Sequence, residues 1–383
     1  VYINLETNLT IASYFNDNIA PERLLRYLEA STGERIIPGE TLIIFDEIQS
    51  CERALTALKY FCEETPEFHI AAAGSLLGVA INRQQYSFPV GKVETITLYP
   101  LDFEEYLWAR GKEFLCGEIR TAYETMEPLP DALHQEAIEL YREYLIIGGM
   151  PACINAFLKS GSFLDVPLVQ SEILDNYIAD MAKYASNTDS VKIRACYNSI
   201  PAQLAKDNKK FQYKVVQKGG SATLFGASIE WLNLAGVVLK CQRINQAFEP
   251  IAVYADLSAF KLYMGDVGLL TMKSGLSQQT VLSGEGNTFM GAVTENYVAQ
   301  QLAAKGYDLY YWESSSTAEL DFVLQTGTQI VGVEAKKGEH VRSRSLSVFV
   351  DSYKPAYSVR LSLKNFGEKD GLKSVPLYAA FCV

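Results

Sequence analysis

Two acidic residues, Asp46 and Glu47, directly follow the apolar run Leu-Ile-Ile-Phe at residues 42–45. Four consecutive apolar residues, two of them β-branched, are typical of a strand buried on both faces of a parallel sheet. The acidic pair would then lie at the C-terminal edge of that sheet, where open α/β sheets bind ligands. In nucleoside triphosphate hydrolysis, Asp46 would help to hold Mg²⁺ and Glu47 would orient the attacking water. The alternative is a buried strand that ends in an exposed turn and has no catalytic role.

A nucleotide site of this kind also needs a glycine-rich loop, G-x-x-x-x-G-K-[ST], whose backbone N–H groups surround the phosphates. The sequence contains no Gly-Lys-Ser or Gly-Lys-Thr, and its Gly-Lys pairs, Gly91-Lys92 and Gly111-Lys112, lack that context. Because Val1 already lies within an expected strand at residues 1–6, we expect a strand–loop–helix unit of roughly 30 residues before it. A degenerate nucleotide site is the alternative.

The first hundred residues alternate between strands and helices. Helices are expected at residues 21–30 and 51–63, and a second buried strand at residues 68–75. This order predicts a parallel sheet with right-handed crossovers. If the two buried strands are neighbours, Ser75 would lie beside Asp46 and could hydrogen-bond the terminal phosphate of a nucleotide. The alternative is an ordinary strand-to-loop turn.

A second acidic cluster lies near the C-terminus. Asp321 and Glu334 fall on expected strands at residues 318–325 and 329–336, which are joined by a tight turn. Both carboxylates could therefore face one side and share a hard divalent cation, Mg²⁺ or Mn²⁺. Lys336 projects from the same face as Glu334. It could orient a water molecule or stabilise charge on a phosphodiester, while the metal supplies hydroxide.

Glu295, on an expected helix at residues 291–305, is a fourth candidate for this cluster. Lys337, Arg342 and Arg344 would make the surface basic enough to admit a phosphate backbone. The alternative is a solvated hairpin with ordinary cross-strand pairing between Glu and Lys.

The middle of the chain is expected to be helical from residue 101 onward. A helix, a short turn, an apolar helix at residues 221–235 and a β-ribbon then follow in the order of a winged helix. The expected recognition helix carries no Lys or Arg, so packing or partner binding is favoured over reading of bases. Residues 188–220 hold seven Lys or Arg against two Asp. They predict either a local basic face or a solvated surface.

Composition narrows the class of protein. A chain of 383 residues exceeds one ordinary core, so two or three domains are expected. The net charge of −11 argues against a wholly basic nucleic-acid binder. The seven cysteines include no C-x-x-C pair, which favours reduced thiols in a cytoplasmic protein. No apolar run approaches the length that crosses a bilayer, so no membrane partner is expected.

Six short segments carry a resemblance to a known family. They are Leu-Ile-Ile-Phe-Asp-Glu-Ile-Gln at 42–49, Ala-Gly-Ser-Leu-Leu at 73–77, Leu-Tyr-Pro-Leu-Asp-Phe-Glu-Glu-Tyr-Leu at 98–107, Gly-Gly-Met-Pro at 148–151, Phe-Lys-Leu-Tyr-Met-Gly-Asp-Val-Gly-Leu at 260–269, and Glu-Leu-Asp-Phe-Val at 319–323 with Val-Glu-Ala-Lys at 333–336. In this order they resemble, over nearly the whole chain, a prokaryotic family of AAA-type ATPases with a C-terminal domain of unknown function.

This resemblance implies a multidomain α/β protein that uses ATP and Mg²⁺. A parallel-sheet P-loop core without its first strand–loop–helix unit would occupy residues 1–100, followed by a helical region at 101–187. A winged-helix-like domain at 188–275 would precede a domain similar to PD-(D/E)-x-K nucleases at 276–383. Where members of the family often have Gly-Arg, this chain has Gly91-Lys92.

Lysine is a poor substitute for a bidentate arginine. If this position serves the nucleotide of a neighbouring subunit in a homo-oligomer, turnover would be weak; Arg83 is a nearby alternative. Three functions stay open. The protein could be an ATPase whose C-terminal domain cuts nucleic acid, or an ATP-dependent switch that binds DNA or a protein through a nuclease-like scaffold. The third is a degenerate interaction protein.

Overall fold

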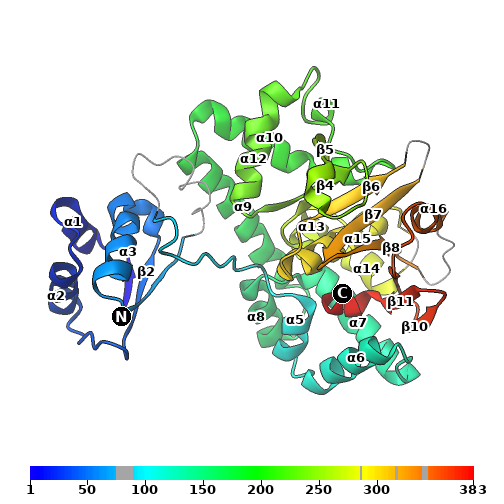
Figure 1. The fold of residues 1–383 in the computed structure, drawn as a ribbon, viewed down its shortest axis with the longest axis horizontal. Helices are drawn as coiled ribbons and strands as arrows, with labels where there is room; N and C mark the ends of the chain where they lie inside the picture. Colours follow the sequence, from blue (N-terminus) through cyan, green and yellow to red (C-terminus); the bar gives the residue numbers. More distant parts are fainter. Residues whose placement is uncertain (75–88, 285–286, 315–317, 339–343) are drawn as a thin grey trace. The chain divides into compact units, whose positions relative to one another are not determined.

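The computed structural model describes residues 1–74, 89–284, 287–314, 318–338 and 344–383 (Figure 1). The chain divides into two compact units, Val1–Leu98 with Leu234–Gly236, and Tyr99–Asn233 with Val237–Val383. The expected domain boundaries inside the second unit remain predictions.

The first unit contains a parallel three-stranded sheet, as the alternation of strands and helices predicts. Its strands are β1 (Tyr2–Asn4), β2 (Leu42–Asp46) and β3 (His69–Ala72), in the order β1-β2-β3. The central strand β2 pairs in parallel with both neighbours. Asp46 is therefore the last residue of the central strand.

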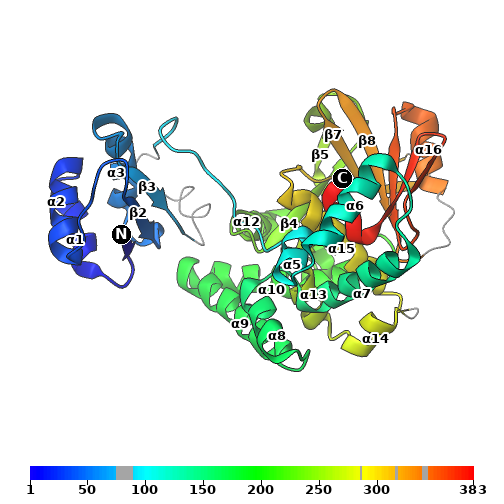
Figure 2. The ribbon, with the colours of Figure 1, turned by 90° about the horizontal axis from the view of Figure 1, so that it is seen from below.

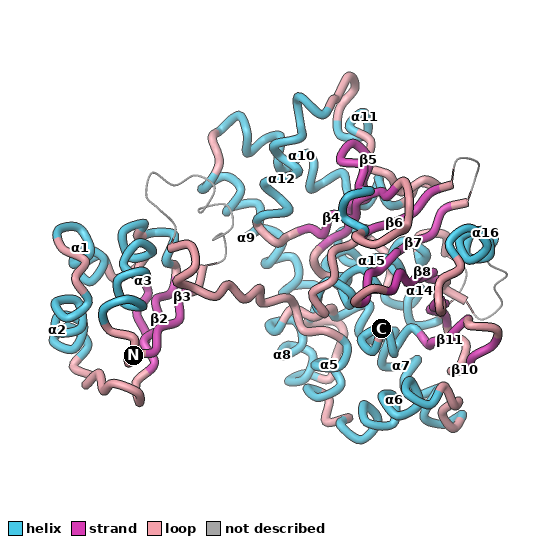
Figure 3. The backbone as a smooth tube through the Cα atoms, in the orientation of Figure 1, coloured by secondary structure: helices cyan, strands magenta, loops and turns pink. Residues whose placement is uncertain are grey.

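Three helices pack against this sheet (Figures 1 and 3). They are α1 (Leu9–Asp17), α2 (Pro21–Thr32) and α3 (Glu52–Glu64), with a short 3-10 helix, η1 (Ile48–Ser50), after β2. Helix α2 begins with Pro21 and ends at Gly33 in the left-handed conformation, as its sequence signals predict. Helix α1 was not anticipated from the sequence; the Asn8 side chain caps it by accepting from the Ile11 N–H.

Strand β2 is buried on one face only within its unit. Ile43 and Phe45 lie in the core with residues of all three helices, whereas Leu42 is 47% exposed. The expectation of a strand buried on both faces is therefore wrong for Leu42. Successive side chains of a strand point to opposite faces, and α1, α2 and α3 pack against the side chains of one face.

The second unit begins with a run of helices, in agreement with the expected helical middle. They are α5 (Phe103–Ala109), α6 (Glu113–Thr125), α7 (Asp131–Ile147), α8 (Pro151–Ser160), α9 (Val166–Tyr184), α10 (Asn187–Leu204), α11 (Tyr213–Val216) and α12 (Ala222–Leu234). Helix α5 starts with a capping box, in which Asp102 and Glu105 each bond the other's backbone N–H. No helix in the described ranges has the length and apolar character that a membrane span requires.

The second unit also contains an eight-stranded sheet. Its strands are β4 (Val238–Ile244), β5 (Ala255–Met264), β6 (Tyr310–Glu313), β7 (Glu319–Thr326), β8 (Gln329–Ala335), β9 (Ser358–Ser362), β10 (Gly367–Lys369) and β11 (Leu372–Pro376), in the order β10-β11-β9-β8-β7-β6-β4-β5. The remaining helices are α13 (Val267–Ser274), α14 (Gln278–Ser283), α15 (Met290–Ala304) and α16 (Arg344–Tyr353), with 3-10 turns η2 (Ile251–Tyr254) and η3 (Leu377–Cys382).

The β-ribbon expected as a wing is the edge of this same sheet. Strands β4 and β5 pair in the antiparallel sense (Figures 2 and 3), and β4 also pairs in parallel with β6 (Figure 3). A strand has two hydrogen-bonding edges, and the second edge of β4 bonds to β6. The ribbon is therefore continuous with the strands that carry Asp321 and Glu334, and it is not a free-standing wing.

Two of the segments that carry the family resemblance, residues 148–151 and 260–269, are in contact in the interior of the second unit. The Asp266 carboxylate accepts hydrogen bonds from the Gly149 N–H at 2.6 Å and the Leu269 N–H at 2.9 Å. A Cβ atom at Gly268 would lie 2.5 Å from the Gly148 backbone nitrogen, so the end of α7 and the start of α13 touch through backbone. These segments therefore have a packing role.

Candidate functional site

The first candidate site lies at the C-terminal end of β2. The Tyr2 hydroxyl, from β1, donates to Asp46 Oδ2, and the Glu47 N–H donates to Asp46 Oδ1 at 2.9 Å. This hydrogen bond to Asp46 raises the pKa of Tyr2 above its usual value. Each oxygen of the Asp46 carboxylate thus accepts a hydrogen bond, and these two bonds fix the orientation of the carboxylate at the edge of the sheet.

Glu47 sits in a sharp turn between β2 and η1. Its φ of 52° places it in the left-handed region, which is uncommon for residues other than glycine and is often found at functional sites. Its carboxylate accepts a hydrogen bond from Gln49 Nε2 at 2.5 Å. The turn places Glu47 directly after β2, and Gln49 holds its carboxylate by a hydrogen bond.

The end of β3 runs close to this turn. Phe45 pairs with Ala72, and a Cβ atom at Gly74 would lie 2.2 Å from Gln49 Oε1. A side chain at this position would require the Gln49 side chain to move. Ser75 follows directly, but Ser75 and Arg83 lie outside the described residues.

Lys92 lies in the first unit, with its ammonium group 3.0 Å from the Glu63 carboxylate of α3. Glu63 raises the pKa of Lys92 by hydrogen bonding and by its charge. Both side chains are more than a third exposed, so this pair contributes little to stability. The role of Lys92 at a neighbouring nucleotide stays a prediction.

The Asp46 site fits the way in which proteins hold Mg²⁺ with a nucleotide. In such sites one or two carboxylates act together with phosphate oxygens and water. Asp46 supplies one carboxylate, and Glu47 is the next residue in the chain. When bound, Mg²⁺ would neutralise charge on the phosphates.

The second candidate site joins β7 and β8. Phe322 pairs with Val333, so Asp321 and Glu334 take the next positions of the two strands. Asp321 Oδ2 accepts from the Ala335 N–H at 2.9 Å, and Lys336 lies 3.0 Å from Glu334. The structure thus brings Asp321, Glu334 and Lys336 together.

Glu295 faces ammonium groups. It pairs with Lys209 and lies 3.7 Å from Lys261, and the Tyr263 hydroxyl donates to it at 3.3 Å. Burial alone would raise the pKa of Glu295, but Lys261 and Lys209 outweigh it and hold the pKa below its usual range. Glu295 is therefore an ion-pair partner of two lysines.

Lys261 is the residue that the sequence interpretation missed. Its side chain is fully buried, and its ammonium group lies 2.6 Å from Glu319 and over the Tyr311 ring. Burial and the Glu295 carboxylate raise the pKa of Asp321 to about 7, although Lys261 lowers it. The signal was a lone lysine within the otherwise apolar end of β5, Phe-Lys-Leu-Tyr-Met.

The expected Mg²⁺ or Mn²⁺ site does not fit this donor set well. Glu295 and Glu319 already have lysine partners, and no group of three His, Cys, Asp or Glu within the described ranges could hold a metal ion. One buried oxygen, Glu334 Oε2, has no hydrogen-bond partner among the described residues. A cation would find at most the two carboxylates of Asp321 and Glu334.

Three lysines of the expected basic face are half-buried and have polar partners. Lys209 and Lys210 pair with Glu295 and Glu313, and Lys206 donates to the Gln212 side chain at 3.3 Å. Helix α12 buries Phe225 and Trp231, which is consistent with a packing role for the expected recognition helix. These segments present less positive surface than their composition suggests.

Three further basic residues were expected to favour binding of a phosphate backbone near Asp321 and Glu334. Lys337 is exposed and donates to the Asn287 carbonyl at 2.8 Å, and Arg344 is exposed at the start of α16. Arg342 lies outside the described residues.

Comparison with known proteins divides the chain into three parts. Residues 1–107 match the family profile of an AAA domain, and residues 138–280 and 290–380 match two domains of unknown function, DUF8612 and DUF4143. Uncharacterized proteins of Mycobacterium tuberculosis and Mycobacterium bovis are 37% identical over 79 residues, which is 20% of this chain and 18% of each relative. The match thus spans less than a fifth of the length of these relatives.

A Walker-type ATPase of Pyrococcus abyssi is a structural neighbour, with a TM-score of 0.38, 15% identity and coverage of 66% of each chain. The N-terminal part of the chain is thus similar to an AAA domain. The C-terminal match is to a domain of unknown function.

Proposed function

We propose that the protein hydrolyses Mg²⁺-ATP, with Asp46 as a ligand of the magnesium and Glu47 as the group that orients the attacking water. The observation that carries this proposal is the position of the acidic pair at the end of the central strand β2, in the part of the chain that matches an AAA domain. Tyr2 and the Glu47 N–H fix the Asp46 carboxylate. Glu47 follows directly in a left-handed turn.

The test is ATP hydrolysis by the whole protein, including any residues that precede Val1. Glu47→Gln should lower kcat by at least about 100-fold, because the amide cannot assist the water. The variant should still bind ATP. Glu52→Gln is a matched control, since Glu52 is an exposed residue of the nearby helix α3, and it should leave turnover unchanged. Unchanged turnover in Glu47→Gln would remove Glu47 from the mechanism.

The chain that starts at Val1 should bind ATP weakly, because its sequence contains no G-x-x-x-x-G-K-[ST] loop. Equilibrium dialysis with labelled ATP measures this. Tight binding by that chain would show that other backbone groups hold the phosphates.

For the C-terminal part, we propose an ATP-controlled binding element for DNA or a protein partner. The lysine pairing of Glu295 and Glu319 supports a scaffold over a metal centre. A metal-dependent nuclease is the second candidate, and the proximity of Asp321, Glu334 and Lys336 favours it. Cleavage of DNA or RNA that needs Mn²⁺ and is lost in both Asp321→Ala and Lys336→Ala would establish the nuclease. Absence of cleavage by the folded wild type would leave the scaffold.

A homo-oligomer is part of the same proposal, with Lys92 or Arg83 of one subunit reaching the nucleotide of the next. Light scattering with and without ATP tests assembly. If assembly occurs, Lys92→Arg should raise turnover, because guanidinium binds phosphate oxygens in a bidentate manner.

A further inference from the structure

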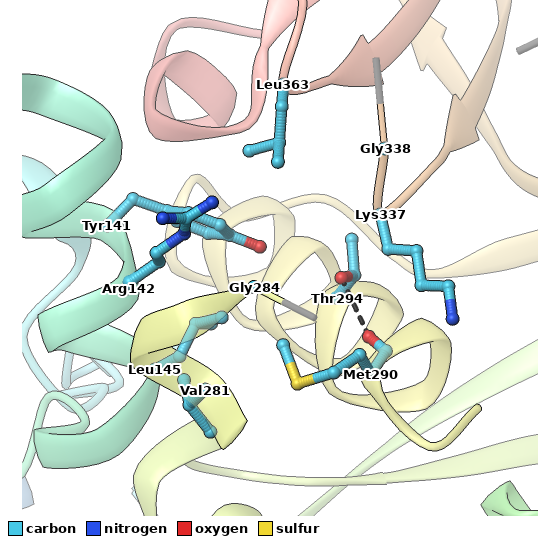
Figure 4. Close-up of a pocket in the computed structure, with 10 residues that line it drawn as sticks. All are labelled: Tyr141, Arg142, Leu145, Val281, Gly284, Met290, Thr294, Lys337, Gly338 and Leu363. Carbon is cyan, nitrogen blue, oxygen red and sulfur yellow. Dashed lines mark hydrogen bonds between the residues drawn. The ribbon is translucent and has the colours of Figure 1, made fainter. Parts of the chain in front are cut away.

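A pocket of about 150 Å³ in the second unit contains none of the residues considered so far as catalytic (Figure 4). Residues of α7, α14 and α15 line it, together with Lys337 and Gly338 after β8 and Leu363 after β9. Its polar groups come mainly from Tyr141 and Arg142, two adjacent residues of α7.

Arg142 is held at the pocket by close contact with the end of α14. Gly284 caps that helix at a φ of 68°, and a Cβ atom there would lie 2.5 Å from Arg142 Nη2. Arg142 Nη1 donates to the Leu282 carbonyl at 3.3 Å. No ion pair joins Arg142 to a carboxylate of the described residues. The guanidinium group therefore lines the pocket and has N–H donors that are available to a ligand.

Tyr141 presents a buried hydroxyl to the same space. Its side chain is 3% exposed, and the hydroxyl makes no hydrogen bond of ordinary geometry within the described part of the chain, although the Thr294 side chain lies near enough to lower its pKa against the effect of burial. Figure 4 shows this oxygen directed toward the interior of the pocket, near Thr294. Burial raises the pKa of Tyr141, so the hydroxyl keeps its proton and remains a donor. A buried hydroxyl without a well-formed hydrogen bond is unfavourable, and a ligand acceptor would satisfy it.

The rest of the wall is apolar. Leu145, Val281, Met290 and Leu363 line it, and the Thr294 hydroxyl is already bonded to the Met290 carbonyl at 2.8 Å. None of the lining residues is acidic. The pocket thus joins a donor-rich, cationic end to an apolar end.

We propose that this pocket binds a small carboxylate with a short aliphatic tail. The carboxylate would accept hydrogen bonds from the Arg142 guanidinium and the Tyr141 hydroxyl, and the tail would contact Leu145 and Val281. Planar guanidinium matches a carboxylate in a bidentate manner. A cavity volume of about 150 Å³ suits an acid of a few carbons. The site is separate from Asp46 and Glu47 and does not depend on ATP hydrolysis.

The test uses pentanoate as the probe and the whole protein without nucleotide, with isothermal titration calorimetry as the readout. Saturable binding of one pentanoate per chain is expected, with a Kd of about 1 mM. Arg142→Gln should weaken it at least about tenfold, as loss of a charge-assisted hydrogen bond does. Tyr141→Phe should weaken it by about threefold. Arg194→Gln, at an exposed position of α10, is the matched control and should bind as the wild type does.

Three further measurements test the proposed carboxylate site. Pentanol, which has the tail without the charge, should not bind, and acetate and inorganic phosphate should bind more weakly than pentanoate. Leu363→Trp, at a half-buried position of the wall, should block the pocket in a protein that circular dichroism shows to be folded. A folded wild type without saturable pentanoate binding would overturn the proposal. So would undiminished binding in a folded Arg142→Gln, or tighter binding of phosphate.

Discussion

Lys261 has its ammonium group in the interior of the second unit. Its side chain has 0% exposure, and Glu319 and Glu295 lie 2.6 Å and 3.7 Å from its Nζ atom. Removing a charge from water is costly, and nearby carboxylates repay the cost only when their geometry is good. The contribution of Lys261 to stability therefore depends on its two carboxylate partners, Glu319 and Glu295.

Lys261→Met should lower the free energy of unfolding by about 1–3 kcal/mol, because Glu295 then keeps only Lys209 and the partly exposed Glu319 loses its lysine partner. Urea denaturation measures the change. Lys240→Met on the neighbouring strand β4 is the control. Lys240 lies 3.4 Å from Glu230, which is half exposed, and loss of such a pair costs at most about 1 kcal/mol. Equal costs for the two substitutions would mean that the Lys261 network stabilises nothing.

Asp256 makes a pH-dependent contribution to stability. Hydrogen bonds from Ser258 and Arg243 lower the pKa of Asp256 to about 2, below the unfolded value of about 3.9. Its contribution is therefore present above about pH 4 and is lost as the pH falls toward about 2. Asp256→Asn should cost up to about 1 kcal/mol at pH 7. The difference from wild type should shrink between pH 4 and pH 2, whereas a constant difference would contradict this assignment.

At the scale of elements, the contact between the end of α7 and the start of α13 depends on glycine. A Cβ atom at Gly268 would lie 2.6 Å from the Ile147 carbonyl oxygen, and backbone atoms cannot move aside as a flexible side chain can. The Asp266 carboxylate bridges the same two helices through the Gly149 and Leu269 N–H groups. Separation of α7 from α13 would leave these buried groups without partners.

Gly268→Ala should therefore destabilise the second unit by about 1–3 kcal/mol, as overpacking typically does. Thermal or urea unfolding followed by circular dichroism tests it. Gly226→Ala is the control, because Gly226 lies within α12 and a Cβ atom there meets nothing within 4 Å. That change should be neutral or stabilising by up to about 1 kcal/mol. A stabilised Gly268→Ala protein would disprove the close contact.

At the scale of the whole molecule, most cysteine side chains are buried in the cores of the two units. All seven cysteines are free; five are buried, Cys382 is half-buried and Cys62 is exposed. Burial raises the pKa of Cys153 and of Cys196 to about 12. A thiol reacts as its thiolate, so these two groups are protected both by poor access and by low ionisation.

The folded protein should accordingly show one fast thiol in a titration with Ellman's reagent at pH 8, and Cys62→Ser should remove it. All seven should react after denaturation. Cys153→Ser should leave the fast phase unchanged. Several fast thiols in the native wild type would indicate that the buried cysteines become accessible by local opening.

The amino-acid sequence by itself determined the elements whose signals are local. Pro21 and Gly33 bound α2, Asp102 and Glu105 cap α5, and the apolar run before Asp46 forms β2. These signals act within a few residues, through fixed φ angles, caps and side-chain alternation. For the same reason, the acidic pair at the end of β2 was readable as a candidate nucleotide site.

Only the tertiary structure decided what surrounds the other charges. Lys261 meets Glu295 from 34 residues away, and Lys209 meets it from 86 residues away. The pairing of β4 with β6 likewise places the expected wing in the C-terminal sheet. Such contacts depend on which elements pack together and which buried groups then need a partner. The spacing of residues along the sequence does not predict this. Glu295 was therefore recognisable as a functional type of residue, but whether it faces a metal or two lysines is set by the fold.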